Sequence, residues 1–546
     1  MMRERRYPIA PNRALGRSSS EMFGECLLRH TICMLRKCQV REKPEPSTYG
    51  QDTVNFNFLA DVTSDTDLRH MAKSLYEAAK YRELLELLEL QPDSWRSDVF
   101  LLNLAGACLL ALGSNVGAER HYRSMIASYG DNAEAYCNLG LILQNKGDVF
   151  EAELVYKKAI SISPDFPEAY NNLGLLYMAQ GNLAEAEAAY RKAIAANPTF
   201  ALAFYNLGNV LLKGANGRDY IDLAEAAFRK ALENNPNFDK ACNTLGGILL
   251  ATGRYKESEA MFLRAISIAP RFADAHFNLG RLYHNLLGLQ DSTPAESAYR
   301  HALTIEPNHA AAHGELGRLL RDLGSLDEGI AHMRRAVDCA PNSMRLHSNL
   351  VYSLMFQAEE GATVLEECRR WATRYETPLL HEKLSHKNEP SVSRRIRVGY
   401  VSPDFRDHCQ SLFTTPLLRH HNHEKFEIFL YSFTRVEDEV TRRISTYADV
   451  WRDVKFLSDL DLAKQINDDR IDILIDLTMH MADARPLVFA RRPSPIQVAW
   501  LAYPGTTGMS SVDYRLTDLK MMRTTASAQS DCLRPSGATI QVRTCQ

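Results

Sequence analysis

The chain has 546 residues, of which 45% are hydrophobic and 24% charged, a balance typical of globular proteins and long enough for two or more domains. Its formal net charge of -3 argues against the basic surface that nucleic-acid binding needs, so we expect no nucleic-acid partner. The 11 cysteines form no CxxC pair and no apolar run is long enough to span a membrane, so we expect reduced thiols, no metal site, no membrane partner and a cytoplasmic location.

Residues 1–64 are expected to form a disordered or poorly ordered N-terminal segment. The opening stretch RERRYPIAPNRALGRSSS is rich in Arg and Ser, but acidic residues soon follow it. It also lacks the apolar core of a signal peptide. We therefore expect no secretory or organelle address here.

Residues 65–357 are expected to form an array of helix pairs, regular from about residue 100. A tripeptide Asn-Leu-Gly, or a near variant, recurs every 34 to 38 residues, and a proline follows each copy. In residues 169–198, apolar residues have helical spacing on both sides of Gly181 and the second helix ends before Pro198, which predicts a helix-turn-helix unit. This pattern resembles the tetratricopeptide repeat family, which implies an all-α superhelix whose concave groove binds a protein or peptide.

Asparagine recurs just before the leucine of most units. These residues are Asn138, Asn172, Asn206, Asn278 and Asn349, and the series is interrupted by Thr244 and Glu315. Because an amide side chain both donates and accepts hydrogen bonds, one interpretation is a ladder that binds the backbone of an extended peptide. The alternative is a set of polar helix-surface residues that keep the groove wet.

The period of the pattern changes after the array. Residues 358–395 are expected to be a helical connector and linker, because a helical pattern gives way to the polar stretch HEKLSHKNEPSVSRR. In residues 396–519, short continuous apolar runs alternate with helical ones, which predicts a parallel sheet covered on both faces, an α/β Rossmann-like lobe. The expected strands are RVGYVS, FEIFLYSF, IDILIDLT, PIQVAWLAYPG and VDYRLTD. Neither a GxGxxG nor a Walker loop is present, so no dinucleotide or P-loop site is expected.

Four segments of this lobe follow one another in a characteristic order. They are RVGYVSPDFRDH, DILIDLTMHMADAR, RPSPIQVAWLAYPGTTG and DYRLTD. With the repeats upstream, they resemble the N-terminal catalytic lobe of the protein O-linked N-acetylglucosamine transferases. The resemblance implies half of a glycosyltransferase B-type fold and inverting transfer of N-acetylglucosamine from UDP-N-acetylglucosamine to Ser or Thr of proteins selected by the repeats, with no metal and no other cofactor.

The same resemblance implies catalytic roles for two histidines. His408, on the loop after the first expected strand, matches a family histidine considered as a base or as an active-site organiser, although Cys409 stands where the family usually has proline. The alternative is a loop histidine bonded to backbone. His480 matches a glycine-His/Tyr-threonine loop in which Met479 and Met481 replace glycine and threonine. Its alternative is a buried histidine packed between methionines.

A third segment is implied to face the sugar nucleotide. Its residues are Tyr503, Pro504, Gly505, Thr506 and Thr507. Glycine lets backbone amides approach a ligand and threonine hydroxyls can bond a sugar, whereas the alternative is a tight turn between strands. Arg485 has two open interpretations, a partner for phosphate or for a structural carboxylate.

The alternation of strands and helices ends near Asp518, and residues 520–546 are expected to form an irregular tail. In the family a second lobe supplies most of the UDP pocket. We therefore expect a truncated family member that by itself transfers sugar poorly or not at all. The alternative function is a non-catalytic tetratricopeptide scaffold that binds protein or peptide partners.

Overall fold

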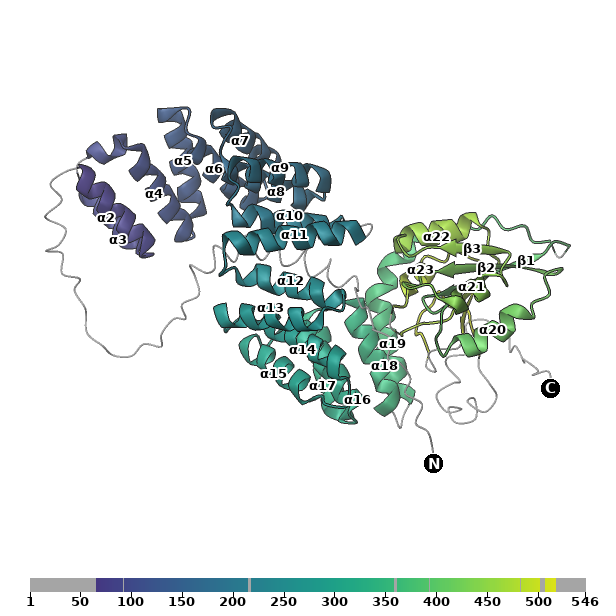
Figure 1. Ribbon diagram of the computed structural model, residues 1–546. Helices are drawn as coiled ribbons and strands as arrows, with labels where there is room; N and C mark the ends of the chain where they lie inside the picture. The colour runs from purple at the N-terminus through teal and green to yellow at the C-terminus, as the bar shows by residue number, and fades with distance from the viewer. Residues whose placement is uncertain are drawn as a thin grey trace. The chain divides into compact units, whose positions relative to one another are not determined.

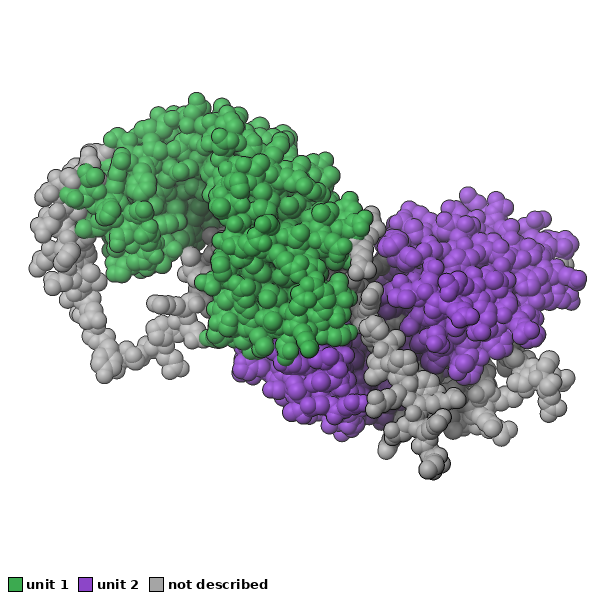
Figure 2. Space-filling view, viewed as in Figure 1, with its two compact units in different colours: residues 1–278 green, residues 279–546 purple. Residues whose placement is uncertain are grey.

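The structure is a computed structural model that describes residues 65–91, 93–214, 218–357, 361–391, 393–481, 483–500 and 506–516. The segments expected at 1–64 and 520–546 lie outside the described residues. By compactness the chain divides into two units, residues 1–278 and 279–546, coloured separately in Figure 2. The domain boundaries expected from the sequence differ from this division and stay predictions.

The first unit consists of helices joined by short turns (Figure 1). They are α2 (Asp65–Glu77), α3 (Tyr81–Leu90), the 3-10 helix η2 (Asp93–Ser97), α4 (Val99–Ala111), α5 (Asn115–Tyr129), α6 (Ala133–Lys146), α7 (Val149–Ile162), α8 (Pro167–Gln180), α9 (Leu183–Ala196), α10 (Ala201–Lys213), α11 (Arg218–Asn234), α12 (Asp239–Ala251) and α13 (Tyr255–Ile268). Helix α14 (Ala273–Leu287) crosses the division between the units. The helix pair expected at residues 169–198 is confirmed as α8 and α9.

Two glycines of each regular unit have separate physical reasons. Gly181 ends α8 with a φ of 82°, a left-handed conformation that glycine adopts without steric cost. Gly174, in the repeated tripeptide, lies against the ring of the fully buried Tyr190, and a Cβ at Gly174 would be 2.6 Å from that ring. The recurring glycine is therefore the place where the two helices of one unit pack most closely.

The second unit begins with further helices and continues into a sheet (Figure 1). Its first helices are α15 (Thr293–Ile305), α16 (Ala310–Asp322), α17 (Leu326–Cys339), α18 (Met344–Gln357), α19 (Gly361–Tyr375) and the 3-10 helix η3 (Thr377–Glu382). The lobe that follows contains β1 (Ile396–Ser402), α20 (Ser411–Arg419), β2 (Phe426–Ser432), α21 (Glu439–Ser445), β3 (Val450–Asp453), α22 (Asp459–Asp468), β4 (Ile473–Asp476), α23 (Pro486–Ala490), β5 (Ile496–Trp500) and β6 (Tyr514–Leu516). Among the described helices of both units, none combines the length and apolar character that a membrane crossing requires.

The sheet is parallel throughout, with strand order β3-β2-β1-β4-β5-β6. Both faces are covered: Val401, Tyr431 and Leu474 share a core with α22 and α23, whereas Tyr400 and Ile428 share one with α20 and α21. The expected fold class, an all-α superhelix followed by an α/β Rossmann-like lobe, is confirmed. Strand β3 was not predicted, because its four half-exposed residues VWRD form no apolar run.

The strand order reverses between β1 and β4. From β1 the chain proceeds to β2 and β3 on one side of the sheet, and β4, β5 and β6 lie on the other. In open α/β sheets, ligands bind outside the carboxyl ends of the strands at such a switch point. The loops that leave β1 and β4 therefore flank the position where a ligand is expected.

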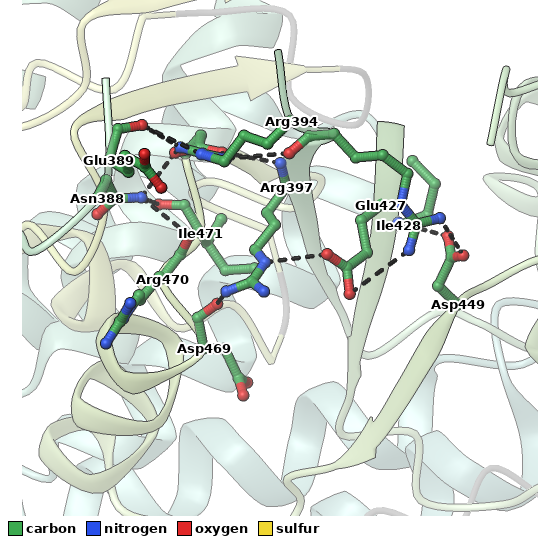
Figure 3. Close-up of polar contacts among 12 residues, drawn as sticks. Asn388, Glu389, Arg394, Arg397, Glu427, Ile428, Asp449, Asp469, Arg470 and Ile471 are labelled. Carbon is green, nitrogen blue, oxygen red and sulfur yellow. Dashed lines mark hydrogen bonds and ion pairs between the residues drawn. The ribbon is translucent and has the colours of Figure 1, made fainter. Parts of the chain in front are cut away.

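The linker lies at the opposite, amino-terminal edge of the sheet, where it is hydrogen-bonded to the residues just before β4 (Figure 3). The Asn388 amide and the Arg394 guanidinium both donate to the Asp472 carboxylate, at 2.7 Å each, and Asn388 also donates to the Arg470 and Ile471 carbonyls. Partial burial raises the pKa of Asp472, but these bonds outweigh it and hold that pKa below its usual value. The polar linker is thus bonded to the lobe.

Candidate functional site

The loop after β1 carries His408 beside the switch point. Its side chain is 26% exposed, and its Nδ1 lies 3.8 Å from the Asp404 carboxylate. The Gln410 backbone N–H donates to the same Nδ1 at 3.3 Å. Because Nδ1 accepts this bond, the neutral ring carries its proton on Nε2, which then acts as a donor. This arrangement suits an organiser of the site better than a base.

The Asp404 carboxylate is the acidic group next to the His408 ring. Burial raises the pKa of Asp404, and the positive charges of His408 and Arg406 oppose this rise. The Ser402 hydroxyl accepts from the Asp404 backbone N–H at 3.0 Å, which fixes the start of the loop.

Gln410 connects the loop after β1 to the end of β4. Its side chain is almost fully buried, and its amide donates to the Leu477 carbonyl at 3.1 Å. The Ser402 hydroxyl contacts the other side of the same amide at 3.5 Å. Gln410 was not among the residues predicted from the sequence, because a glutamine before a short helix carries no local signal of a contact 67 residues away.

His480, on the loop after β4, is 2% exposed and lies inside the protein. Its Nε2 is 3.0 Å from the Thr507 carbonyl, and its ring packs edge-on against Trp371 with centroids 4.9 Å apart. Burial lowers the pKa of His480 to about 4, so the ring is neutral at pH 7 and Nε2 donates to Thr507. The burial agrees with the alternative of a buried histidine, and a catalytic role for His480 stays a prediction.

The turn before His480 places Met479 in a left-handed conformation. Met479 has a φ of 52°, in the left-handed region, where the family loop has glycine. The Asp476 carboxylate accepts from the backbone N–H of Thr478 at 2.8 Å and of Met479 at 3.0 Å. These two bonds hold the turn in a conformation that methionine otherwise disfavours.

The segment expected to face the sugar nucleotide is described only in part. Tyr503, Pro504 and Gly505 lie outside the described residues. The hydroxyl of Thr506 accepts from the Gly508 N–H at 3.2 Å, and that of Thr507 accepts from the Met509 N–H at 3.3 Å. A hydroxyl that accepts one bond still has a hydrogen to donate, and of the two side chains Thr506 is half-buried whereas Thr507 is 7% exposed.

Gly508 brings this loop against helix α19. It has a φ of 69°, and a Cβ there would lie 2.5 Å from the backbone carbon of Cys368. The Cys368 thiol in turn donates to the Thr506 carbonyl at 3.1 Å. Gly508 is therefore needed for close packing of two parts of the chain as well as for its left-handed backbone.

Arg485 follows its structural alternative. Its guanidinium donates to the Asp459 carboxylate at 2.7 Å and to the Leu457 carbonyl at 2.7 Å, and the side chain is 7% exposed. The group is thus bound to the first residue of α22 and to the loop before this helix. The structure favours this pairing over a phosphate partner.

The repeated asparagines of the first unit donate to the preceding repeat. The Asn206 amide donates to Asn171 at 2.8 Å and the Asn278 amide donates to Asn243 at 3.0 Å, while Asn172 contacts the Cys137 sulfur at 3.4 Å. A hollow of about 320 Å³ is lined by Glu134, Cys137, Asn138, Phe166, Glu168, Asn171, Asn172, Phe200 and Leu202. Two of the predicted peptide-binding residues, Asn138 and Asn172, therefore border a groove large enough for side chains.

Asn349, the one predicted ladder residue in the second unit, is half-buried on α18. Its backbone carbonyl accepts from the Ser353 hydroxyl at 2.7 Å. A peptide-binding role for the five asparagines stays a prediction.

The model of glycosyl transferase family 41 matches residues 360–531. Tetratricopeptide repeat models match residues 167–200 and the overlapping ranges 215–271, 243–286 and 284–343. The family 41 match thus covers the connector and the whole described lobe. The repeat matches cover the helix pairs upstream.

Curated relatives match over shorter stretches. The chain is 35% identical over 183 residues to the probable UDP-N-acetylglucosamine–peptide N-acetylglucosaminyltransferase SPINDLY of Arabidopsis thaliana, which is 33% of this chain and 20% of that protein. It is 40% identical over 126 residues to the protein named SEC of the same plant, 23% of this chain and 13% of that one. The matches therefore span about a fifth or less of these relatives.

A solved structure of a mutant O-GlcNAc transferase from Thermobaculum terrenum is 32% identical, covers 54% of each chain and has a TM-score of 0.46. The segments matched by the family models coincide with the observed helix pairs and with the parallel sheet. The chain contains a segment that matches tetratricopeptide repeat models, followed by a segment that matches the glycosyl transferase family 41 model.

Proposed function

We propose that this protein takes part in the transfer of N-acetylglucosamine from UDP-N-acetylglucosamine to Ser or Thr hydroxyls of proteins bound by its repeats. The observation that carries the proposal is the position of His408, on the loop beside the switch point of a lobe that matches family 41. The names of the matched relatives agree with this reaction. Because the matches cover a small part of those relatives, the complete activity is proposed for the lineage of the chain.

The reaction forms one bond and breaks one. The acceptor hydroxyl oxygen attacks the anomeric carbon from the face opposite the diphosphate, the bond from that carbon to the diphosphate oxygen breaks, and UDP leaves with the electron pair. The hydroxyl proton passes to a base or to the departing phosphate. In the tautomer that the Gln410 bond to Nδ1 favours, His408 supplies an Nε2–H that orients an oxygen of the reactants.

The test compares two histidine variants of the full chain, in an assay sensitive enough to measure the weak transfer expected of this chain by itself. Replacement His408→Ala is expected to lower incorporation of labelled N-acetylglucosamine into an acceptor peptide by at least about 100-fold, the scale of a positioned proton-handling or orienting group. His420→Ala is the matched control, because this exposed histidine at the end of α20 bonds the Pro416 carbonyl of its own helix. Equal activity of the His408 variant and the control would contradict the role.

The groove of the first unit supports a second candidate function, binding of an extended peptide without catalysis. The supporting observation is the hollow bordered by Asn138 and Asn172. The double variant Asn138→Ala, Asn172→Ala is expected to weaken binding of an acceptor peptide about tenfold, since each lost amide removes a backbone hydrogen bond. Fluorescence anisotropy of a labelled peptide measures this. The exposed Asn182→Ala, in the turn before α9, is the control, and an unaltered affinity of the double variant would remove the ladder interpretation.

A further inference from the structure

A buried carboxylate at the end of α19 binds the loop that carries Thr506 and Thr507. Glu376 is 2% exposed and lies between α19 and η3. Its carboxylate accepts from the Ser510 N–H at 2.9 Å, from the Ser510 hydroxyl at 3.2 Å and from the Ser511 N–H at 2.7 Å. We call residues 506–511 the anchor loop.

The position of the anchor loop and the burial of Glu376 depend on each other. A buried carboxylate is costly unless hydrogen bonds satisfy its oxygens, and bonds to a charged acceptor are the stronger kind. The three donors described for this carboxylate all come from two successive residues of the anchor loop. Displacing the loop would leave the carboxylate without these donors.

Further contacts hold the same loop. The Cys368 thiol of α19 donates to the Thr506 carbonyl, and Gly508 packs against the Cys368 backbone. His480 donates to the Thr507 carbonyl at 3.0 Å. The carbonyls of both threonines are thus engaged by the protein, while each hydroxyl keeps a hydrogen for a ligand. Helix α19 therefore fixes the backbone of both threonines, of which Thr506 is half-buried and Thr507 is 7% exposed.

We propose that Glu376 is a positioning residue for the sugar of the donor nucleotide. It acts through the anchor loop, by holding the Thr506 and Thr507 hydroxyls where they meet the sugar of UDP-N-acetylglucosamine. The inference rests on the proposed function. Glu376 lies in the expected connector and has no signal in the sequence, because its bonds reach 134 and 135 residues along the chain.

The test uses the full chain with Glu376→Gln, which keeps the size of the side chain and removes its charge. Hydrogen exchange at the Ser510 and Ser511 amides is expected to become about 10- to 100-fold faster, because hydrogen bonds to a charged carboxylate are lost. Calorimetric titration is expected to show about tenfold weaker binding of UDP-N-acetylglucosamine with unchanged binding of UDP, since the threonines contact only the sugar. Glu376→Asp, which keeps the charge, is expected to restore part of the difference.

Glu382→Gln is the matched control, because Glu382 lies on the adjacent η3 and its carboxylate pairs with Arg491 at 2.7 Å. This variant is expected to leave both the exchange and the two affinities unchanged. Unaltered exchange in Glu376→Gln, or an equal loss of affinity for UDP and UDP-N-acetylglucosamine, would overturn the role of Glu376 and leave the proposed function standing. If the unmodified chain bound neither nucleotide, the proposed function would fail and the donor role of Glu376 with it.

Discussion

His408 and His480 lie on loops that leave adjacent strands, β1 and β4, yet their surroundings differ. His408 is partly exposed and has a carboxylate at 3.8 Å, whereas His480 is enclosed between Trp371 and the Thr507 carbonyl. Their positions at strand ends were predictable, because apolar strand runs precede both. Their burial was not, since Trp371 and Thr507 are distant in sequence.

The burial of His480 predicts a dependence of stability on pH. The unfolded ring binds a proton as the pH falls below 6.5, whereas burial keeps the folded ring neutral until about pH 4. Because the unfolded state binds more protons in this window, the free energy of unfolding is expected to decrease from pH 6.5 to pH 4, by about 3 kcal/mol in the limit.

Urea unfolding at pH 7 and pH 4.5 measures this effect. His480→Gln, whose amide can still donate to the Thr507 carbonyl, is expected to show a smaller loss of stability between the two pH values than the unmodified chain. His420→Gln alters an exposed histidine and is expected to leave the difference unchanged. The same pH dependence in all three proteins would show that His480 is not protected from protonation.

At the scale of elements, the repeat units were the most predictable part of the chain. In most regular units the glycine recurs because an aromatic ring packs on it, for example Tyr156 on Gly140 and Phe262 on Gly246, whereas Gly317 packs against Gly329 and Met333. This constraint acts within one helix pair, so it leaves a periodic mark in the sequence. Strand β3 has no such pattern in its sequence, because this half-exposed strand of four residues is held in the sheet by its pairing with β2.

Two adjacent glycines of α12 test the packing argument. A Cβ at Gly246 would lie 2.6 Å from the Phe262 ring, whereas a Cβ at Gly247 meets no atom within 4 Å. Gly246→Ala is therefore expected to lower the free energy of unfolding by about 1–3 kcal/mol through overpacking. Gly247→Ala is expected to raise it by up to about 1 kcal/mol, because alanine favours the helix more than glycine does.

Thermal or urea unfolding of the two variants provides the comparison. They carry the same chemical change at neighbouring positions, so their difference isolates the contact with Phe262. Equal stabilities would contradict the assignment of the repeated glycine to close helix packing.

At the scale of the molecule, one of the two apolar cores of the second unit includes both its last helix pairs and one face of the lobe. Leu350, Trp371, Tyr431 and Phe489 all belong to it. Trp371 is fully buried and donates its indole N–H to the Ser348 hydroxyl at 3.0 Å, while its ring meets His480. The helices before the sheet and the sheet itself are therefore expected to unfold together.

Trp371→Ala tests this shared core. The loss of a fully buried tryptophan is expected to lower the free energy of unfolding by about 3–5 kcal/mol. Hydrogen exchange is expected to accelerate both in α18 and in the anchor loop. Trp451→Ala, at a half-buried position on β3, is expected to cost less and to leave α18 unaffected. Faster exchange confined to α18 would contradict a common core.

The sequence by itself determined the helix-turn-helix period, the parallel strands and the loop on which His408 lies. These features depend on contacts within one unit or on runs of apolar residues, and such contacts repeat along the chain. Only the tertiary structure decided that His480 is enclosed, that Arg485 pairs with Asp459, and that Glu376 holds the anchor loop. Those facts depend on segments that meet in space at separations of up to 135 residues, for which no local pattern of residues is required.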